Sequence, residues 1–498
     1  MEHLERITTT LGIEKKDITR YQPVSIDELK KDFLKLRQQY SAISVISRGN
    51  NWGYGCHAPN KDHSLLIDLS LCKAIKEFDD YHGIITIEPG LSYGMLAEYL
   101  QAQGDRWIAP VHGAGVDASV LGNVLERGYG ITPNTDHFGA VQSLKAILNN
   151  GELYQGSLAN LNQPHLDQLF KYGIGPYYDG LFSQSGLGIV TEVTIKLYPK
   201  AEYSEMFAFG IKNPQQLGLL VEKIKIIKRN FSSSLSGLNL MNRERCLSML
   251  VDYPLEKIKS REPLSEEELQ KWSKQYQVDS WLLVGMIYGP KAIVKAIKKE
   301  IKTELKVIKK QSFFFSSTTF SYMTLAKKIL HLLQLNQFVQ SLDSLAGAFS
   351  VLMGKPSNIA LKLAYWKNEN KELIRQESLN PNRDGCGLIW YAPLVELKAQ
   401  SVQRYVEFVQ SISAKHRINC LITLTTIDDL WFDSTIPILF NQNDPLDVKR
   451  ANDYYQDLLN EGQKLGFIPY RLNIQSQEAF KIQNSNFKFS QINSDRYK

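Results

Sequence analysis

Two glycine-rich segments in the first third of the chain constrain its fold more than any other feature. The first, SRGNNWGYGCHAP (47–59), follows the strand-like SVIS and carries glycines at 49, 53 and 55. Glycine takes positive φ angles and lets a ligand approach the backbone, and successive N–H groups in such a loop bind anions. The segment therefore fits a pyrophosphate cradle, and it fits an ordinary glycine-rich turn equally well.

The second segment spans residues 112–141 and holds too many glycines for a plain helix. Its interleaved polar residues are too ordered for a linker, so we expect backbone lying flat against a large planar ligand. A Rossmann site needs GxGxxG between a strand and a helix. Both GAGVDA (113–118) and GIGPYYDG (173–180) miss that spacing. If a dinucleotide binds here, it binds by another route.

Composition places the chain among soluble globular proteins. Its 498 residues predict about three domains or two large ones, and 43% hydrophobic with 22% charged residues exclude a disordered or coiled-coil chain. A net charge of +6 is too dilute at this length to favour nucleic acid. No apolar run reaches the roughly 20 residues of a membrane helix, and no signal peptide is evident. Five scattered cysteines without a CxxC pair argue against disulfides or a zinc site, so we expect a cytoplasmic protein without a bound metal.

Short β-rich runs alternate with amphipathic helices in the first two hundred residues, which predicts an α+β fold. SLLIDLS (64–70) and GIITIEP (83–89) are expected strands. Asn150-Gly151 predicts a type I′ turn between two hairpin strands.

Helix starts are also marked in the sequence. Ser25 with Glu28, and Ser265 with Glu268, predict capping boxes. Long Lys-rich helices appear after about residue 205. In 291–310 we expect the lysines to form the solvated face of a packed helix rather than a nucleic-acid patch.

At these glycine-rich segments the sequence resembles the vanillyl-alcohol oxidase and p-cresol methylhydroxylase family of flavoproteins. Three long motifs carry the resemblance in the family's order, and together they are far more specific than any glycine pattern. They are SRGNNWGYGCHAP (47–59), VLGNVLERGYGITPNTDH (120–137) and QLFKYGIGPYYDGLFSQSGLGIVTEVTIKLYPKAE (168–202). Weaker motif matches extend the resemblance over about residues 40–475, among them WYAP (390–393) and YRLN (470–473).

The resemblance implies a two-part architecture. It places an FAD-binding domain of the p-cresol methylhydroxylase type at 1–204, a cap domain with an antiparallel sheet flanked by helices at 205–467, and a returning C-terminal segment at 468–498. The first loop would cradle the pyrophosphate and the second segment would line the flavin. The residues that the resemblance assigns to FAD are Gly49, Asn50, Asn51, Gly53, Gly55, Gly113, Ser119, Gly122, Asn123, Glu126, Arg127, Gly128, Gly130, Thr132, Asp136, His137, Gly188, Ile189 and Val190.

The resemblance also implies a substrate site. In the family, two tyrosines and an arginine hold a 4-alkylphenol as its phenolate, and Tyr54, Tyr470 and Arg471 match them. The implied activity is FAD-dependent oxidation of a para-substituted phenol or related aromatic alcohol, with hydride transfer to flavin N5. Thr423 and Trp390 are expected to line the substrate site.

The residues that attach the flavin covalently in the family are missing here. The family uses a His or a Tyr shortly before the WYAP-like segment, and 378–393 has neither, with Leu388 in the histidine position. Non-covalent FAD is therefore expected. Cys56 and His57 replace the family's Gly and Ala, and we expect them to be simple lining residues.

Acid and base groups of the family are also replaced. The cap-domain glutamate of the hydroxylating members appears as Thr423, which puts water activation in doubt. The family's paired histidines fall near Phe432-Asp433. His137 is retained, and we expect it to serve structural hydrogen bonding rather than catalysis.

Two other functions stay open at this stage. One is a flavin dehydrogenase of another alcohol or hydroxy acid, with Arg471 gripping a carboxylate. The other is a flavin-binding partner protein that has lost turnover. The sequence does not distinguish oxygen from a redox protein as electron acceptor, and the resemblance alone implies a homodimer.

Overall fold

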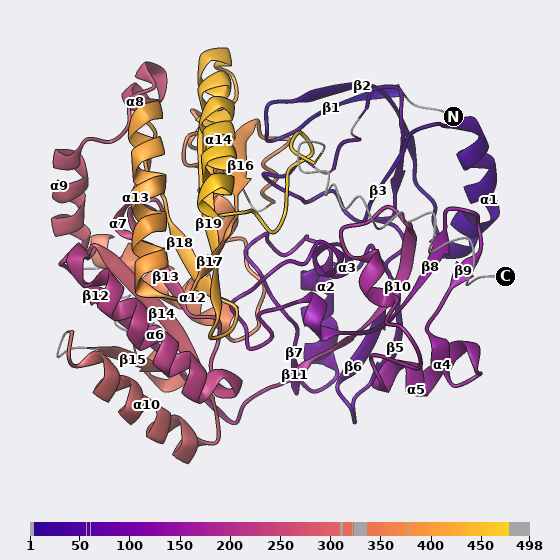
Figure 1. Ribbon diagram of the computed structural model, residues 1–498, viewed down its shortest axis with the longest axis horizontal. Helices are drawn as coiled ribbons and strands as arrows, with labels where there is room; N and C mark the ends of the chain where they lie inside the picture. Colours follow the sequence, from indigo (N-terminus) through magenta and orange to yellow (C-terminus); the bar gives the residue numbers. More distant parts are fainter. Residues whose placement is uncertain are drawn as a thin grey trace.

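Three large β-sheets in the described part of the chain build two lobes that lie side by side (Figure 1). The computed structural model describes residues 4–55, 57–59, 61–308, 312–320, 322, 336–376 and 378–477, without side chains for 336–342. Cys56 and positions 478–498 of the expected C-terminal segment lie outside the described residues. Helices and mostly antiparallel strands mix in both lobes, which confirms the α+β fold.

The first lobe holds a four-stranded and a five-stranded sheet. Their strand orders are β1-β2-β4-β3 and β5-β6-β10-β8-β9. The two expected strands are confirmed as β4, which pairs in parallel with β2 and β3, and β6, which pairs antiparallel with β5 and β10. The strands are β1 (Leu4–Thr8), β2 (Glu14–Tyr21), β3 (Ile43–Ile46), β4 (Leu65–Asp68), β5 (Ile75–Asp79), β6 (Ile84–Ile87), β8 (Val141–Leu148), β9 (Leu153–Tyr154) and β10 (Gly188–Lys196), with β7 (Trp107–Ile108) and β11 (Tyr198–Pro199) as a separate pair.

Helices α1 and α2 each begin at a serine cap in this lobe. Ser25 accepts the N–H of Glu28 at 3.2 Å, but the Glu28 carboxylate accepts from Val24 rather than Ser25, so the expected capping box is only half formed. The second expected box, Ser265 with Glu268, is complete. The helices of the first lobe are α1 (Ile26–Gln39), α2 (Tyr93–Ala102), α3 (Val120–Leu125), α4 (Ser157–Asn160) and α5 (Pro164–Leu169).

The hairpin between β8 and β9 forms as expected, but with a different turn. The Leu148 N–H donates to Glu152 O at 2.8 Å, which leaves a three-residue loop. Gly151 has a φ of 88°, whereas Asn150 is not among the residues with positive φ. A type I′ turn needs positive φ at both central residues, so that prediction was wrong. Because Asn149 adds one residue to the loop, Gly151 is the one residue of this loop with a left-handed backbone conformation.

The second lobe is built on an eight-stranded antiparallel sheet, the expected cap sheet. The strand order is β15-β12-β14-β13-β18-β19-β16, with β17 also paired to β19. The boundary expected after residue 204 falls just inside the first of these strands. The strands are β12 (Tyr203–Ile211), β13 (Asn239–Asn242), β14 (Trp281–Gly289), β15 (Phe313–Ser316), β16 (Cys386–Tyr391), β17 (Leu394–Glu396), β18 (Thr423–Thr426) and β19 (Trp431–Asn441).

The two faces of the cap sheet have different neighbours, because successive strand residues point to opposite sides. Phe207, Leu283 and Leu424 belong to a buried apolar core shared with helices α6, α10, α13 and α14, which cover one face (Figure 1). The opposite face turns toward the first lobe. The helices of this lobe are α6 (Leu217–Phe231), α7 (Arg243–Leu247), α8 (Leu255–Ser260), α9 (Glu266–Tyr276), α10 (Lys291–Leu305), α12 (Asn336–Leu352), α13 (Ala399–His416) and α14 (Pro445–Leu465).

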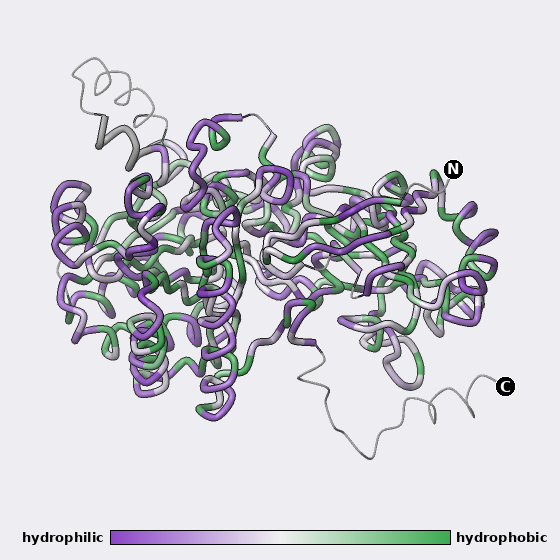
Figure 2. The backbone as a smooth tube through the Cα atoms, turned by 90° about the horizontal axis from the view of Figure 1, so that it is seen from above, coloured by the Kyte–Doolittle hydropathy of each residue, from purple (hydrophilic) through white to green (hydrophobic). Residues whose placement is uncertain are grey.

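The Lys-rich helix α10 packs as expected from its sequence. Its buried residues are Val294, Ile297, Ile301 and Leu305, and most of its lysines are exposed. Hydrophilic stretches accordingly follow the outlying helices at both ends of the molecule (Figure 2). Among the described residues, no helix combines the length and the apolar character needed to cross a lipid bilayer.

The segment after α14 connects the two lobes. The Tyr470 N–H donates to Ala392 O in the cap at 3.2 Å, and the Ile474 N–H donates to Tyr54 O in the first lobe at 3.0 Å. The described part of the expected C-terminal segment therefore lies against both lobes at once.

Candidate active site

A cavity of about 1700 Å³ lies where the two lobes meet. Its size exceeds the usual range for a small ligand alone, and suits a dinucleotide together with a substrate. Most residues that the sequence assigned to FAD line it, as do Thr423 and Trp390. The assigned residues in the lining are Gly49, Asn50, Asn51, Gly113, Ser119, Gly122, Asn123, Glu126, Arg127, Gly128, Gly130, Gly188, Ile189 and Val190.

Five of the assigned residues lie outside that lining: Gly53, Gly55, Thr132, Asp136 and His137. Gly53 has a φ of 77°, and a Cβ there would lie 2.3 Å from Trp390 Cδ1. The Trp390 N–H also donates to Gly53 O at 3.1 Å. Glycine is thus required at this position by a cap strand that packs against the loop.

His137 lies behind the cavity wall. It is fully buried, its Nδ1 pairs with Asn123 Nδ2, and a Cβ on Gly130 would lie 2.5 Å from its Nε2. Asn123 itself lines the cavity, so His137 supports the cavity wall from behind.

His112 is a cavity residue that the sequence analysis did not single out. Its Nδ1 accepts the N–H of Ala114 at 2.9 Å, which places the ring proton on Nε2. Nε2 is buried without a hydrogen-bond partner among the described residues. Burial, and then the charge of Arg471, lower the pKa of His112 to about 3, so the ring is neutral. A buried donor in the cavity wall fits a cofactor that brings hydrogen-bond acceptors, as FAD does.

Tyr54, Tyr470 and Arg471 come together at one wall of this cavity. The Arg471 guanidinium lies 4.2 Å from the ring centre of Tyr54, and its Nε lies 2.9 Å from Glu126 Oε2. The ring of Tyr470 lies 4.8 Å from that of Tyr129. The structure therefore brings Tyr54 together with Tyr470 and Arg471, which lie more than four hundred positions later in the sequence.

Burial sets the protonation of the two tyrosines. It raises the pKa of Tyr54 above its ordinary value, although Arg471 and a hydrogen bond with Tyr470 act in the opposite direction. Burial also raises the pKa of Tyr470. Both hydroxyls are therefore protonated at neutral pH and able to donate, beside a permanently charged guanidinium.

Asp433 on β19 lines the same cavity, near the position where the family's paired histidines fall. Its side chain is only 6% exposed, and its Oδ1 has no hydrogen-bond partner among the described residues. Burial raises the pKa of this carboxyl well above its ordinary value. No short motif marks Asp433, and only the alternation of residues along β19 indicates which face it takes.

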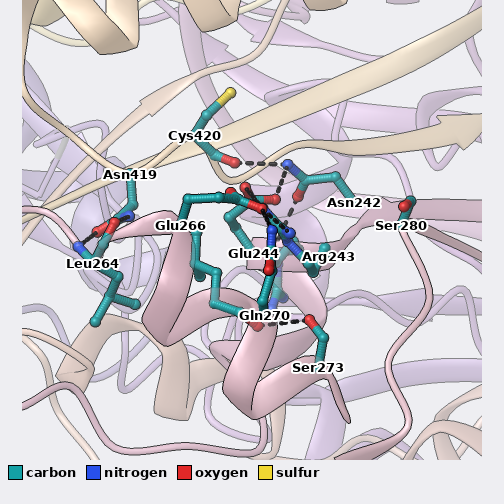
Figure 3. Close-up of polar contacts among 12 residues, drawn as sticks. Asn242, Arg243, Glu244, Leu264, Glu266, Gln270, Ser273, Ser280, Asn419 and Cys420 are labelled. Carbon is teal, nitrogen blue, oxygen red and sulfur yellow. Dashed lines mark hydrogen bonds and ion pairs between the residues drawn. The ribbon is translucent and has the colours of Figure 1, made fainter. Parts of the chain in front are cut away.

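Arg245 on α7 is a second lining residue without a sequence motif. Burial lowers the pKa of its guanidinium to about 10, and among the described residues its side-chain hydrogen bond is to the Ser248 hydroxyl at 3.2 Å. A network of polar contacts fixes helix α7, which carries Arg245 (Figure 3). Asn242 caps that helix by accepting the Arg245 N–H, and its amide donates to Cys420 O at 2.7 Å.

Comparison with known proteins supports the resemblance seen in the motifs. A family model described as FAD binding domain matches residues 20–157. The chain is 29% identical over 470 residues to 1'-carboxy-chondrochloren decarboxylase of Chondromyces crocatus, covering 93% of this chain and 85% of that protein. It is 21% identical over 444 residues to the 4-cresol dehydrogenase (hydroxylating) flavoprotein subunit of Pseudomonas putida, covering 88% and 76% respectively.

The fold is also similar to a solved structure, 4-ethylphenol oxidase from Gulosibacter chungangensis in its isoeugenol complex. The TM-score is 0.80 at 20% identity, over 92% of this chain and 82% of that one. The resemblance inferred from the sequence is thereby confirmed, and so is FAD as the cofactor.

Proposed function

We propose that this chain, an FAD-binding oxidoreductase of the vanillyl-alcohol oxidase and p-cresol methylhydroxylase family, oxidises a para-substituted phenol or a related aromatic alcohol. The observation that carries the proposal is the meeting of Tyr54, Tyr470 and Arg471 at one wall of the FAD cavity. When bound, FAD supplies the acceptor for a hydride, that is, for two electrons and a proton. We assign its binding to the lining residues named above and to His112.

The three residues suit a phenolate. A free phenol has a pKa near 10, so ionising it at pH 7 costs about 4 kcal/mol. The protonated hydroxyls of Tyr54 and Tyr470 donate to the phenol oxygen, and Arg471 places a positive charge beside it. Charge-assisted hydrogen bonds of this kind are strong enough to offset that cost. The ionised oxygen then pushes electron density through the ring toward its para position, and hydride leaves the substituent carbon attached there.

We propose that FAD is held without a covalent bond. Leu388, in the position of the family's attached histidine, is an aliphatic residue, 2% exposed, that lines the cavity. Acid precipitation of purified protein tests this directly. We expect a yellow supernatant, and a yellow pellet would contradict the proposal.

Anaerobic titration tests the activity. Addition of 4-ethylphenol should bleach the flavin absorbance stoichiometrically, while a hydroxy acid without a phenol ring should not. Bleaching only by the hydroxy acid would favour a dehydrogenase of another alcohol. Bound flavin that no phenol, alcohol or hydroxy acid reduces would instead favour a binding protein without turnover.

A second candidate is oxidative decarboxylation of a phenolic acid. One relative, at 29% identity, is named a decarboxylase. Arg245 offers a partly buried cation in the same cavity, and a substrate carboxylate would form an ion pair with it. Loss of hydride from the carbon next to the ring gives a quinone methide. A carboxylate on the following carbon then leaves as carbon dioxide, and its bonding electrons restore the phenolate.

This route needs no water-activating base, which agrees with Thr423 in place of the family's glutamate. Incubation with 3-(4-hydroxyphenyl)propionate should release carbon dioxide and 4-vinylphenol in equal amounts. A product that retains the carboxylate would exclude decarboxylation and leave the oxidation in place.

A further inference from the structure

Three polar residues stand in one row across the cavity face of the cap sheet. Asn239 of β13 pairs in register with Thr425 of β18, and Thr425 pairs with Asp433 of β19. All three line the cavity. Neighbouring strands lie about 4.8 Å apart, so the row spans roughly 10 Å of cavity wall.

Two acceptor atoms of this row lack donors within the described part of the chain. Asn239 Oδ1 and Asp433 Oδ1 are both buried, and neither has a hydrogen-bond partner among the described residues. Buried polar atoms in folded proteins almost always have a partner, and leaving one without a partner is destabilising. Two such atoms in one row, facing a cavity, indicate that the cavity's ligand brings the donors.

Asp433 also lies close to the proposed phenol site. Its strand is bonded to the segment around Pro393, since the Ser434 N–H donates to Pro393 O at 3.0 Å. Pro393 forms a β-bridge with Pro469, next to Tyr470. The charge of Asp433 contributes to the raised pKa of Tyr54, Tyr470 and Tyr129.

The cation of the proposed phenol site is already engaged. Arg471 forms an ion pair with Glu126 and stacks on Tyr54, and no salt bridge to Asp433 is present in the described part of the chain. Asp433 therefore faces the cavity as a carboxyl to which no described residue supplies a compensating charge. A cationic ligand would allow it to ionise and would form a buried, charge-assisted hydrogen bond.

We propose that Asp433, supported by Thr425 and Asn239, binds a protonated amine on the side chain of the phenolic substrate. The inference rests on the proposed phenol oxidation and names the substrate class more closely. An ammonium group carries three N–H donors and no acceptor, which complements a row of acceptors. A hydroxyl at one end and an amine at the other would then fix the orientation of the ring between them.

Three ligands that share one ring test the proposal. Tyramine carries a cationic side chain, 4-ethylphenol a neutral one and 3-(4-hydroxyphenyl)propionate an anionic one. Each is titrated calorimetrically into holoenzyme whose flavin has been reduced under anaerobic conditions, so that no ligand is oxidised. We expect tyramine to bind at least about tenfold more tightly than 4-ethylphenol, since hydrogen bonds to charged groups contribute about 1.5–3 kcal/mol.

Two variants localise the effect. Asp433→Asn should abolish the preference for tyramine, so that the ratio of its affinity to that of 4-ethylphenol falls to about one. Glu396→Gln removes an exposed carboxylate from the neighbouring strand β17 and should leave the preference intact. Raising the pH should strengthen tyramine binding to the unmodified protein, because ionising Asp433 then costs less, and should not affect binding to Asp433→Asn.

The outcomes separate the two proposals. If wild-type protein binds all three ligands equally, the amine site is refuted while the phenol site stands. If Asp433→Asn weakens every ligand by the same factor, Asp433 supports the site generally and the amine site is again refuted. If no phenol binds to the wild-type holoenzyme, the proposed function itself fails.

Discussion

The guanidinium of Arg471 lies over the ring of Tyr54, 4.2 Å from its centre, while Glu126 holds its Nε at 2.9 Å. The last part of the chain thereby supplies the positive charge, and the first lobe fixes its direction. Because the planar guanidinium stacks on the Tyr54 ring and forms an ion pair with Glu126, its charge is held in place beside that ring.

Replacing Arg471 with lysine should impair phenol oxidation although the charge is retained. Lysine cannot stack as a plane or offer a fork of donors. We expect kcat/KM for 4-ethylphenol to fall about tenfold to hundredfold, equivalent to about 1.4–2.8 kcal/mol. Arg404→Lys is the matched control, since Arg404 lies over Phe467 on the exposed face of α13. Equal activity in the two variants would show that the geometry of Arg471 does not matter.

Gly53→Ala should lower the free energy of unfolding more than Gly104→Ala does. Gly53 and Gly104 both have positive φ, but only Gly53 has a neighbour, Trp390, where a Cβ would stand. Gly104→Ala should cost about 1 kcal/mol from backbone strain alone, and Gly53→Ala about 1–3 kcal/mol more from the clash. Urea unfolding followed by tryptophan fluorescence gives both values. A similar cost for the two variants would contradict the packing described for β16.

Asp433 should make the protein less stable as pH rises. Burial raises the folded-state pKa of this carboxyl above 3.8, so the folded chain holds the proton more tightly than the unfolded chain does. Its contribution to stability is complete below pH 3.8 and is lost as pH rises through the folded pKa. Asp433→Asn should not lose stability in this way. The difference between the urea midpoints of the variant and the wild type should therefore increase as pH rises. A gap independent of pH would mean that Asp433 is ionised in the fold.

Arg245→Gln should weaken binding of phenolic acids selectively. The guanidinium lines the cavity with a hydroxyl, and no carboxylate among the described residues, as its side-chain partner. Affinity for 3-(4-hydroxyphenyl)propionate should fall about tenfold or more, as expected when a charged hydrogen bond is removed. Affinity for 4-ethylphenol should not change. Arg229→Gln, which removes an exposed arginine paired with Asp429, serves as the control. Loss of both ligands together would point to a structural role for Arg245.

Local patterns in the sequence predicted much of the fold. Runs rich in isoleucine and leucine located β4 and β6, capping serines located α1 and α9, and the long glycine motifs located the FAD-binding lobe. The turn at Gly151 was mispredicted because the dipeptide does not specify where strand pairing ends. A single additional loop residue changes the turn type.

The substrate end of the cavity was harder to predict. Asn239, Thr425 and Asp433 lie on three strands, and they become neighbours only through the register of the cap sheet. Arg245 stands on a five-residue helix without a motif. His112 lies in the glycine-rich segment, but its unpartnered Nε2 becomes evident only once the fold buries it. These features depend on contacts between residues that are far apart in the sequence, and the spacing of residues along the chain does not predict such contacts.

The backbone hydrogen bonds from Ile474 to Tyr54 and from Tyr470 to Ala392 affect what the chain can do while it is being synthesised. A ribosome releases Tyr54 early, yet the partners that complete its pocket emerge only after α14 has been made. Until then the cofactor-binding lobe lacks Tyr470 and Arg471, two of the three residues proposed to bind a phenol. A chain interrupted before residue 470 is therefore expected to carry flavin, if it folds, without being able to reduce it.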